Sequence, residues 1–388
     1  MRRYYLIISI LFSLIIAENS APIFLLHGFL GWGRNEVNDF YYWGGKFDLE
    51  TWLREEGYEV YTLSVGPVSS NWDRATEAYF QIKGGQVDYG VAHSKKYGLI
   101  QKPAGKVYKG LYPEWDENHP IHIISHSQGG QTALMLERLL HQELTGETSE
   151  ILSSKNENWI KSVTTISSPL NGTTLSDIVM KSFPMTIKMG IWLGAIYDDG
   201  FLEKYYNFDL DQWGLSRNEN ESIKEFVQRI NNSPAINSKN LSQFDLSIEG
   251  AMNFNEQYTS DKDVHYFSYS TYSTKKATSS DKHFPDWTMN ADLWLAGTLL
   301  GTLSKMDSTW YENDGIVNTI SMNYPKKRNG TEEPNCEFNN KSIPGCWQQM
   351  GRLHIDHHQV IGHGMNNEEV QFLKDLFGNH CQILKEIE

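Results

Sequence analysis

The sequence predicts an α/β protein with a mostly parallel central sheet flanked by helices. One observation is that short buried-strand patterns alternate with helical patterns, which is typical of a doubly wound sheet. Another is that the β-branched run Ile121–Ile124 passes through a tight turn at Ser127 into a helical pattern that begins at Gln128. A chain of 388 residues with 13% aromatic residues can also bury one large core. Sites in such sheets lie at the carboxyl ends of the strands.

The first half of the chain alternates between the two patterns from its first strand onward. The loop His27–Gly33 contains three glycines, which suits a segment that folds closely over a site. In chain order the expected elements are a strand at Ile23–Leu26, a helix at Asp48–Gly57, a strand at Glu59–Val65, a helix at Asn71–Lys83, a helical pattern within Gly84–Tyr97 and a strand at Ser162–Ile166.

The middle of the chain differs in character from the first half. Leu175–Tyr197 is strongly apolar with few charges, which fits either a core helix or a mobile lid whose apolar face covers a cleft. We expect the lid at about 175–197, followed by an insertion at about 198–260 that is polar between Tyr205 and Tyr258. A strand is expected at Val264–Ser270, and a terminal helix near Glu368–Phe377 is expected among the loops of the last third.

The amino-terminal residues have the layout of an export signal. Arg2 and Arg3 precede an apolar run that ends at Ala17 and is too short to span a bilayer. We therefore expect a signal peptide at 1–17, a single domain at 18–388 and a secreted or lumenal protein. No second apolar run is long enough to be transmembrane. The net charge of −14 argues against nucleic acid and anionic membranes as the main partners.

Two further features agree with an oxidising compartment. Cys336 and Cys346 bracket a short polar loop and could pair there, which would leave Cys381 unpaired. Several of the Asn-x-Ser/Thr sequences are expected to carry glycans on surface loops if the source is eukaryotic. These sequences begin at Asn171, Asn220, Asn231, Asn240, Asn329 and Asn340.

The turn Ser-His-Ser-Gln-Gly has the shape of a nucleophile elbow around Ser127. Small residues let a strand reverse sharply into a helix and present the serine hydroxyl at the edge of the sheet. The usual motif begins with glycine, whereas Ser125 stands at that position here. An ordinary strand–turn–helix junction is the alternative interpretation of the same residues.

A serine nucleophile needs a base and a carboxylate that orients the base. Asp314, in an Asn-Asp-Gly turn before an apolar run, is the most suitable carboxylate after Ser127, although a plain turn aspartate would look the same. The spacing alone does not choose the base among four nearby histidines. The oxyanion hole would come from the backbone N–H groups of Gln128 and Phe29. The four histidines are His354, His357, His358 and His363.

From about Ala21 to Gly362 the chain resembles the thermoalkalophilic lipases of bacilli and their staphylococcal relatives. Many separated motifs occur in the same order, which makes the resemblance specific. It implies an α/β-hydrolase fold and a triacylglycerol lipase. The motifs are HGFLGWG at His27–Gly33, YWGG at Tyr42–Gly45, YTLSVGPVSSNWDR at Tyr61–Arg74, GQVDYGVAH at Gly85–His93, His122–Gln131, Ser162–Leu175, FDLDQWGL at Phe208–Leu215, ENDGIVNTISM at Glu312–Met322 and Asp356–Gly362.

The resemblance implies roles for particular residues. It assigns the catalytic triad to Ser127, Asp314 and His357, and it matches Phe29 and Gln128 to the oxyanion positions. The family has alanine at the first position of the elbow, so Ser125 is a mild change. The segment 175–197 falls where the family has its lid helix.

The metal sites of the family are only partly matched. Asp73, His93 and Asp245 stand in the motifs that carry three of its four structural zinc ligands, while Leu99 replaces the fourth, a histidine. Zinc therefore remains a possible structural cofactor, with an Asp–His ion pair as the alternative. Calcium is not expected, because Gln359 and Gly364 replace acidic ligands of the family.

These observations predict a secreted serine hydrolase that cleaves acylglycerol esters at a lipid–water interface through an acyl-enzyme. No cofactor is expected in the chemistry. A soluble carboxylesterase or a phospholipase on the same fold is the alternative enzyme. A catalytically silent hydrolase-fold protein used for binding is the alternative of a different class. The sequence does not indicate the oligomeric state.

Overall fold

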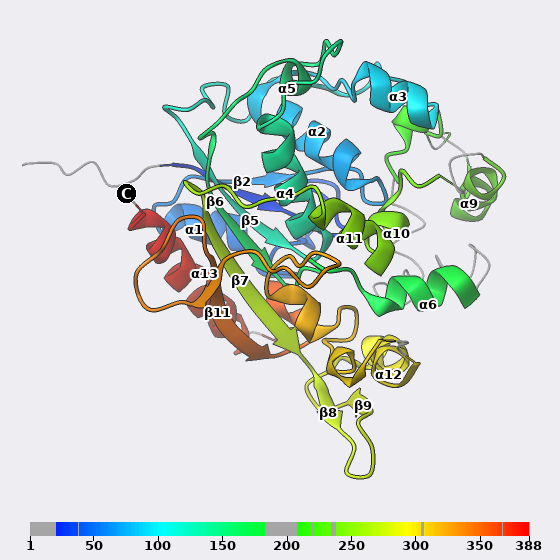
Figure 1. Ribbon diagram of the computed structural model, residues 1–388, viewed down its shortest axis with the longest axis vertical. Coiled ribbons are helices and arrows are strands. Elements are labelled where there is room, and N and C mark those ends of the chain that lie inside the picture. The colour runs from blue at the N-terminus through cyan, green and yellow to red at the C-terminus, as the bar shows by residue number, and fades with distance from the viewer. Residues whose placement is uncertain are drawn as a thin grey trace, which may run out of the picture.

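The computed structural model describes residues 21–37, 39–182, 208–216, 218, 221–233, 238–303, 306–366 and 368–387. Within them, seven strands pair in the order β10-β11-β7-β6-β5-β1-β2, and every pairing in this sheet is parallel. This confirms the α/β-hydrolase class with helices on both faces of the sheet (Figure 1). The strands are β1 (Ile23–Leu26), β2 (Val60–Leu63), β5 (Ile121–His126), β6 (Ile160–Ile166), β7 (His265–Tyr272), β10 (Asn335–Glu337) and β11 (Trp347–His354).

Helices of the first half match the expected patterns closely. Asp48 and Ser70 cap α1 and α2, since each side chain accepts a backbone N–H of the first turn. The segment Gly84–Tyr97 is helical only in its second half. The helices are α1 (Leu49–Glu55), α2 (Asn71–Lys83), α3 (Val91–Tyr97), α4 (Gln128–Leu140), α5 (Glu150–Ser153), α6 (Thr174–Ser182), α9 (Ile223–Asn231), α10 (Ser242–Asp245), α11 (Ile248–Asn255), α12 (Trp294–Leu303) and α13 (Val370–Lys385).

The alternation of side chains along β1 shows how the sheet divides the core. Phe24 and Leu26 point into an apolar cluster that contains buried residues of α2 and α4. Ile23 and Leu25 point into a second cluster with residues of α1 and α13. Successive side chains of a strand face opposite sides, so a fully apolar strand must be covered on both faces.

A third apolar cluster lies beyond the carboxyl ends of the strands. It joins Leu30, Ile316 and Val317 from loops with Leu293 and Leu300 from the region of α12. This cluster consists of loop and helix residues and includes no residue of the seven-stranded sheet. It therefore forms a separate apolar layer above the edge where a site is expected.

The last third is more ordered than the sequence patterns predict. Helix α12 and strands β10 and β11 occupy residues that the patterns left as loops, and α13 extends eight residues beyond the expected end, from Phe377 to Lys385. Two antiparallel ribbons were also not expected. They pair β3 (Gly85–Gln86) with β4 (Val107–Tyr108) and β8 (Thr274–Lys276) with β9 (His283–Pro285).

Several sequence predictions lie partly or wholly outside the described residues. The signal peptide at 1–17 lies wholly outside them, and so do residues 183–197 of the predicted lid, whose first part is α6. In the described part of the insertion at 198–260, α9, α10 and α11 are helical. No helix among the described residues is long and apolar enough to cross a membrane.

The six possible glycosylation sites differ in how exposed their asparagine side chains are. The amide of Asn171 is buried and donates to Tyr324 O at 2.8 Å, and the buried amide of Asn240 donates to Asp73 Oδ2 at 2.8 Å. A glycan does not fit on either side chain. Asn329 and Asn340 are exposed and stay predicted sites, whereas the other two side chains lie outside the described residues.

The cysteine prediction also stays open. The sulfur atoms of Cys336 and Cys346 are 2.6 Å apart, so the two thiols that the sequence pairs are neighbours. Cys381 is buried in the cluster beside α1 and α13. Burial among apolar side chains raises the pKa of its thiol to about 12.

A buried carboxyl group on α4 gives a first testable prediction. Burial raises the pKa of Glu137 to about 7, although the hydroxyls of Tyr258 and Tyr266 donate to it. The folded state thus holds this proton more tightly than the unfolded chain. The resulting stabilisation is complete below about pH 4.5 and is lost as the pH rises to 7.

Glu137→Gln should therefore raise the free energy of unfolding by up to about 3 kcal/mol at pH 8.5 and leave it nearly unchanged at pH 4.5. Urea unfolding at the two pH values measures the difference. Glu143→Gln is the control, because Glu143 is exposed on the loop after the same helix. An equal increase in the free energy of unfolding at both pH values would contradict the explanation by ionisation of the buried Glu137.

Candidate active site

Ser127 lies at the carboxyl end of β5 in a sharply bent turn. Its backbone angles are φ 55° and ψ −129°, a conformation that L-residues rarely adopt, and α4 begins at the next residue. Gly129 permits this bend, because a Cβ there would lie 2.3 Å from Leu26 O. Ser125 fits in place of the usual glycine because its hydroxyl donates to Thr164 O at 2.6 Å. The sequence therefore builds the elbow around Ser127.

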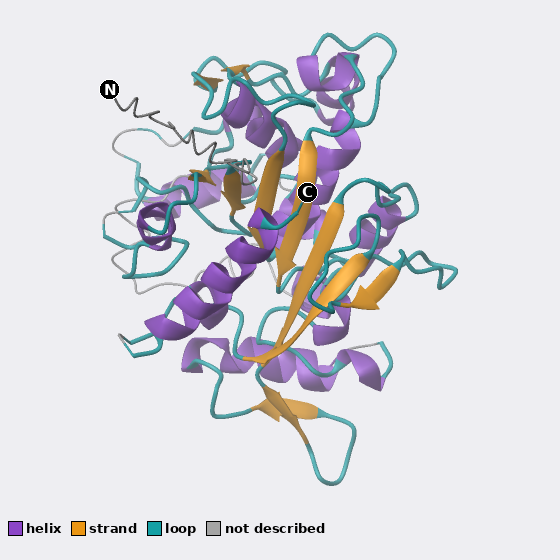
Figure 2. Cartoon of the chain, turned by 90° about the vertical axis from the view of Figure 1, so that its left-hand side faces the viewer, coloured by secondary structure: helices purple, strands orange, loops and turns teal. Residues whose placement is uncertain are grey.

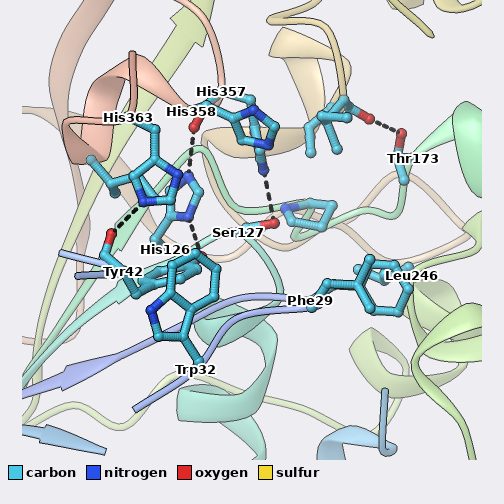
Figure 3. A pocket seen from close by; sticks show the side chains of 15 residues that line it. Phe29, Trp32, Tyr42, His126, Ser127, Thr173, Leu246, His357, His358 and His363 are labelled. Atoms are coloured by element: carbon cyan, nitrogen blue, oxygen red, sulfur yellow. Dashed lines mark hydrogen bonds between the residues drawn. The ribbon is translucent and has the colours of Figure 1, made fainter. Parts of the chain in front are cut away.

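Three side chains distant in sequence form one hydrogen-bonded series at this turn. Ser127 Oγ lies 3.0 Å from His357 Nε2, and His357 Nδ1 lies 2.7 Å from Asp314 Oδ2. All three residues are buried, and Figure 3 shows the imidazole of His357 directed at the serine hydroxyl. Of the four histidines that the sequence left open, His357 is the one that reaches Ser127.

The carboxylate of Asp314 is held in place by further donors. Its Oδ1 accepts the backbone N–H groups of Ile316 and Val317, at 3.0 and 2.8 Å. Its Oδ2 accepts the hydroxyl of Thr271 at 2.7 Å. The backbone also closes the pair, since the N–H of His357 donates to Asp314 O at 3.0 Å. These bonds fix the carboxylate so that it can orient the imidazole.

The other three candidate histidines have different surroundings. His354 is exposed and pairs with Asp286 Oδ2 at 2.7 Å, away from the serine. His358 and His363 line the pocket beside His357. The Nε2 of His363 donates to Tyr42 O at 2.9 Å, and burial lowers the pKa of His363 to about 3. His363 therefore lines the pocket as an uncharged imidazole.

One of the two expected oxyanion donors, Phe29, lines the pocket with Ser127, and the other, Gln128, is the residue after Ser127. Phe29 follows β1, and its side chain lines the pocket together with Ser127. Gln128 is the first residue of α4, where backbone N–H groups have no partner within the helix. The loop of Phe29 approaches the serine closely, since a Cβ on Gly28 would lie 2.6 Å from Ser127 Cβ. The local positive end of α4 suits an oxygen that gains negative charge.

Sequence reasoning missed a hydrogen-bonded chain behind the triad. The hydroxyl of Tyr42 accepts the N–H of Gly28 at 2.8 Å and lies 2.6 Å from His126 Nδ1, while His126 Nε2 lies 3.0 Å from His357 O. Burial lowers the pKa of His126 well below its usual value and raises that of Tyr42. A neutral His126 therefore accepts at Nδ1 and donates at Nε2. Tyr42 stands in the YWGG motif, which offered a signal for this residue.

This series of hydrogen bonds joins the loop of Gly28 and Phe29 to the backbone of His357, so Tyr42→Phe should disturb both at once. The variant leaves a buried N–H and a buried imidazole nitrogen unpaired, at about 1–3 kcal/mol each. We expect kcat for a soluble ester to fall by about tenfold, with KM nearly unchanged. Tyr41→Phe is the matched control. An unchanged kcat with a lowered Tm would reduce Tyr42 to a purely structural role.

The expected zinc ligands do not form a metal site. His93 Nε2 bonds Asp73 Oδ1 directly at 2.9 Å, and Asp73 Oδ2 accepts the side-chain amides of Asn240 and Gln212 at 2.8 and 3.3 Å. Asp245 Oδ2 accepts the backbone N–H of Asn71. Within the described ranges, no group of three or more His, Cys, Asp or Glu residues is placed to hold a metal ion.

The zinc set that the resemblance implies stays a prediction, and the hydrogen bonds around Asp73 do not favour it. Amide NH₂ groups donate hydrogen bonds to the carboxylate where a cation would have to bind, so the donor set does not fit zinc. Burial and the nearby charge of Asp73 raise the pKa of Asp245 to about 7. The Asp73–His93 pair that the sequence offered as the alternative is present, and the His93 ring stacks on Trp72 with centroids 4.7 Å apart.

EDTA should therefore leave the Tm unchanged, whereas Asn240→Ala should destabilise the protein by about 1–3 kcal/mol, because Asp73 loses a buried donor. Thermal unfolding followed by circular dichroism measures both effects. Asn329→Ala, at an exposed position, is the control. A chelator-dependent drop in Tm would show that a metal does stabilise the fold.

The pocket above Ser127 is largely apolar. Its walls come from the loops after β1 and β6, from the end of α10, from the loop that carries Asp314, and from the segment that carries the histidines. A fixed nucleophile, a base and a buried carboxylate in an apolar pocket can transfer an acyl group from an ester to water. The lining residues are Phe29, Leu30, Trp32, Tyr42, His126, Ser127, Pro169, Thr173, Leu246, Ile316, Val317, His357, His358, Ile361 and His363.

Comparison with known proteins relates this geometry to one family. A family model described as "Lipase-like, C-terminal domain" matches residues 19–383. The chain is 34% identical over 360 residues to Lipase 1 of a Staphylococcus aureus strain, covering 89% of this chain and 51% of that protein. It thus spans about half the length of the curated relatives it matches.

Solved structures agree over nearly the whole chain. EstA from Clostridium botulinum is 36% identical with a TM-score of 0.86, covering 96% of this chain and 88% of that one. Lipase 1 from Pelosinus fermentans is 38% identical with a TM-score of 0.78, covering 94% and 99%.

Proposed function

The chain belongs to the lipase-like C-terminal domain family of bacterial lipases, and from this membership and the geometry of its site we propose that it is a serine-dependent triacylglycerol lipase. The substrates would be carboxylic esters of acylglycerols at a lipid–water interface. The hydrogen-bonded series from Ser127 through His357 to Asp314 is the observation that carries this proposal.

In the proposed reaction Ser127 Oγ attacks the ester carbonyl while His357 Nε2 takes its proton. Asp314 holds the imidazole with Nδ1–H directed at the carboxylate and stabilises the imidazolium. The backbone N–H groups of Phe29 and Gln128 stabilise the oxyanion, each contributing about 3 kcal/mol to the lowering of the barrier. His357 then protonates the leaving alcohol. Water, activated by the same histidine, hydrolyses the acyl-enzyme.

The apolar lining favours an acyl chain over a charged substrate. Leu30, Ile316 and Val317 line the pocket and also belong to the third apolar cluster, which continues to α12. Burial of each further methylene of a bound chain contributes roughly 0.8 kcal/mol. A soluble carboxylesterase on the same fold would lack a preference for long chains and for emulsified substrate.

The test combines labelling and chain length. A serine-directed alkyl phosphonate should modify Ser127, as peptide mass analysis detects, and should abolish turnover. The purified protein should hydrolyse p-nitrophenyl palmitate and emulsified triacylglycerol in addition to p-nitrophenyl butyrate. Turnover of butyrate alone would favour the carboxylesterase. No labelling and no turnover would favour a binding protein without catalysis.

The proposal includes export of the protein. Its support is the basic and apolar pattern of residues 1–17, which is typical of a signal peptide. Amino-terminal sequencing of the secreted protein checks this point, and a product that begins at Met1 would contradict it.

A further inference from the structure

The ribbon β8–β9 and helix α12 form an exposed apolar surface outside the pocket. Six of the eleven exposed large apolar side chains found in the described ranges fall between Phe284 and Met306. Trp287 is 87% exposed and Leu295 is 62% exposed. Such a concentration of exposed apolar side chains marks an interaction surface, since exposed apolar residues are normally scattered. We call the set Phe284, Trp287, Trp294, Leu295 and Leu303 the apolar face.

This face is built on fixed backbone. Gly301 lets α12 lie directly against β9, because a Cβ there would be 2.1 Å from His283 O. The turn that presents Trp287 is closed by Asp286, whose N–H donates to Ser273 O at 3.2 Å and whose Oδ1 accepts Thr288 N–H at 2.9 Å. The backbone that carries Trp287 is therefore held in place, which lowers the conformational entropy lost on binding.

The apolar face continues into the active-site region. The inner side of α12 packs in the third apolar cluster, which also contains the pocket residues Leu30, Ile316 and Val317. Asp292, just before α12, lies 3.6 Å from the pocket residue His358. Strand β8 follows the carboxyl end of β7, the same end of the sheet as Ser127. In Figure 2 the ribbon projects beyond the body of the molecule at this end.

The charges of the ribbon contrast with those of the whole chain. The ribbon carries three exposed lysines, Lys275, Lys276 and Lys282. Its one acidic residue, Asp281, pairs with Lys276 at 2.7 Å. The ribbon is thus locally basic, in a protein whose net charge is −14. Exposed tryptophans beside lysines are the combination that binds at a lipid–water boundary, where indole rings lie at headgroup depth and lysines pair with anions.

We propose that the apolar face and the basic ribbon dock the protein on the surface of its lipid substrate, with the lysines paired to fatty-acid carboxylates released there. This docking rests on the proposed lipase function. It places the surface contact beside the pocket, on residues that take no part in the chemistry. Hydrolysis would then enrich the droplet surface in the anions that the ribbon binds.

The experiment measures binding and turnover separately. Binding is measured by flotation with triolein droplets stabilised by phosphatidylcholine, with and without oleic acid, in a Ser127→Ala background that does not consume the droplets. Turnover is measured with the same droplets and with p-nitrophenyl butyrate. The variants are Trp287→Ser/Leu295→Ser and Lys275→Gln/Lys276→Gln. The control is Ile343→Ser, which is 51% exposed on the loop before the amino end of β11.

Trp287→Ser/Leu295→Ser should weaken droplet binding by at least about tenfold and reduce droplet hydrolysis in parallel, while butyrate hydrolysis stays within about twofold. The lysine variant should lose the gain in binding that oleic acid gives. The Ile343→Ser control should match the parent.

Droplet binding by the tryptophan–leucine variant at the parent level would overturn the proposal. A different result is that the parent forms dimers and that this variant dissociates them while its droplet binding is unchanged. That result would assign the apolar face to a contact with a second copy and would also overturn the proposal. If the parent hydrolyses no ester but binds droplets through Trp287, the docking holds and the lipase function fails.

Discussion

Ser127→Ala is expected to lower kcat/KM for every hydrolysed ester by about 10⁴- to 10⁶-fold, since no other group can form the acyl-enzyme. The oxyanion donors and the pocket remain, so a small residual activity over the uncatalysed reaction is also expected. The phosphonate should no longer label the protein. The KM of the residual activity should change little, because the hydroxyl makes few contacts with the bound ester.

Ser125→Ala is the matched control for this loss. Ser125 is a buried serine on β5, two residues before Ser127, and its hydroxyl donates to Thr164 O. Its replacement should keep activity within about threefold. Rates are measured with p-nitrophenyl butyrate, which does not depend on lipid docking. A Ser127→Ala protein with more than one-hundredth of the parent activity would mean that another residue is the nucleophile.

The second large effect is expected from Asp314→Asn, which should reduce kcat by about 10⁴-fold. An asparagine amide in this position donates a hydrogen to His357 Nδ1 and leaves the proton on Nε2. The imidazole then has the wrong tautomer to accept the proton of Ser127. The bonds from Ile316 and Val317 to Oδ1 can be kept, so folding should be little affected.

Asp292→Asn is the comparison for this variant. Asp292 lies 3.6 Å from His358, the residue that follows His357 in the sequence. Loss of its half-exposed charge should change kcat by less than about threefold, because weak surface pairs contribute little. Thermal unfolding confirms that both variants are folded. Equal losses in the two variants would mean that charge near the pocket, and not the tautomer of His357, accounts for the effect.

The elements that could be predicted from sequence are those with local signals. Strand β1 is a short apolar run before glycines, and α2 has both a serine cap and a glycine end, so its bounds agree with the prediction at both ends. The elbow at Ser127 was visible because a strand pattern changes directly into a helix pattern. The choice of His357 among four histidines needed either the family motif or the three-dimensional distances.

The elements that were missed depend on contacts that are distant in sequence. Strand β11 is polar, and it is a strand because it pairs with β7, about eighty residues earlier. The hydrogen bond from the amide of Asn240 to Asp73, 167 residues earlier, could not be predicted from local sequence either. The hydrogen bond between Tyr42 and His126 likewise joins segments 84 residues apart. No periodicity within a single segment reports such pairs.

The third apolar cluster has a consequence for how this protein can diverge. The two clusters on the faces of the sheet stabilise the fold, while the pocket residues Leu30, Ile316 and Val317 belong to a layer outside the seven strands. Substitutions at these three positions therefore change the shape of the pocket in a region whose repacking leaves both sheet faces intact. Substrate range can drift, in nature or in directed evolution, while the thermodynamic margin of the scaffold is retained.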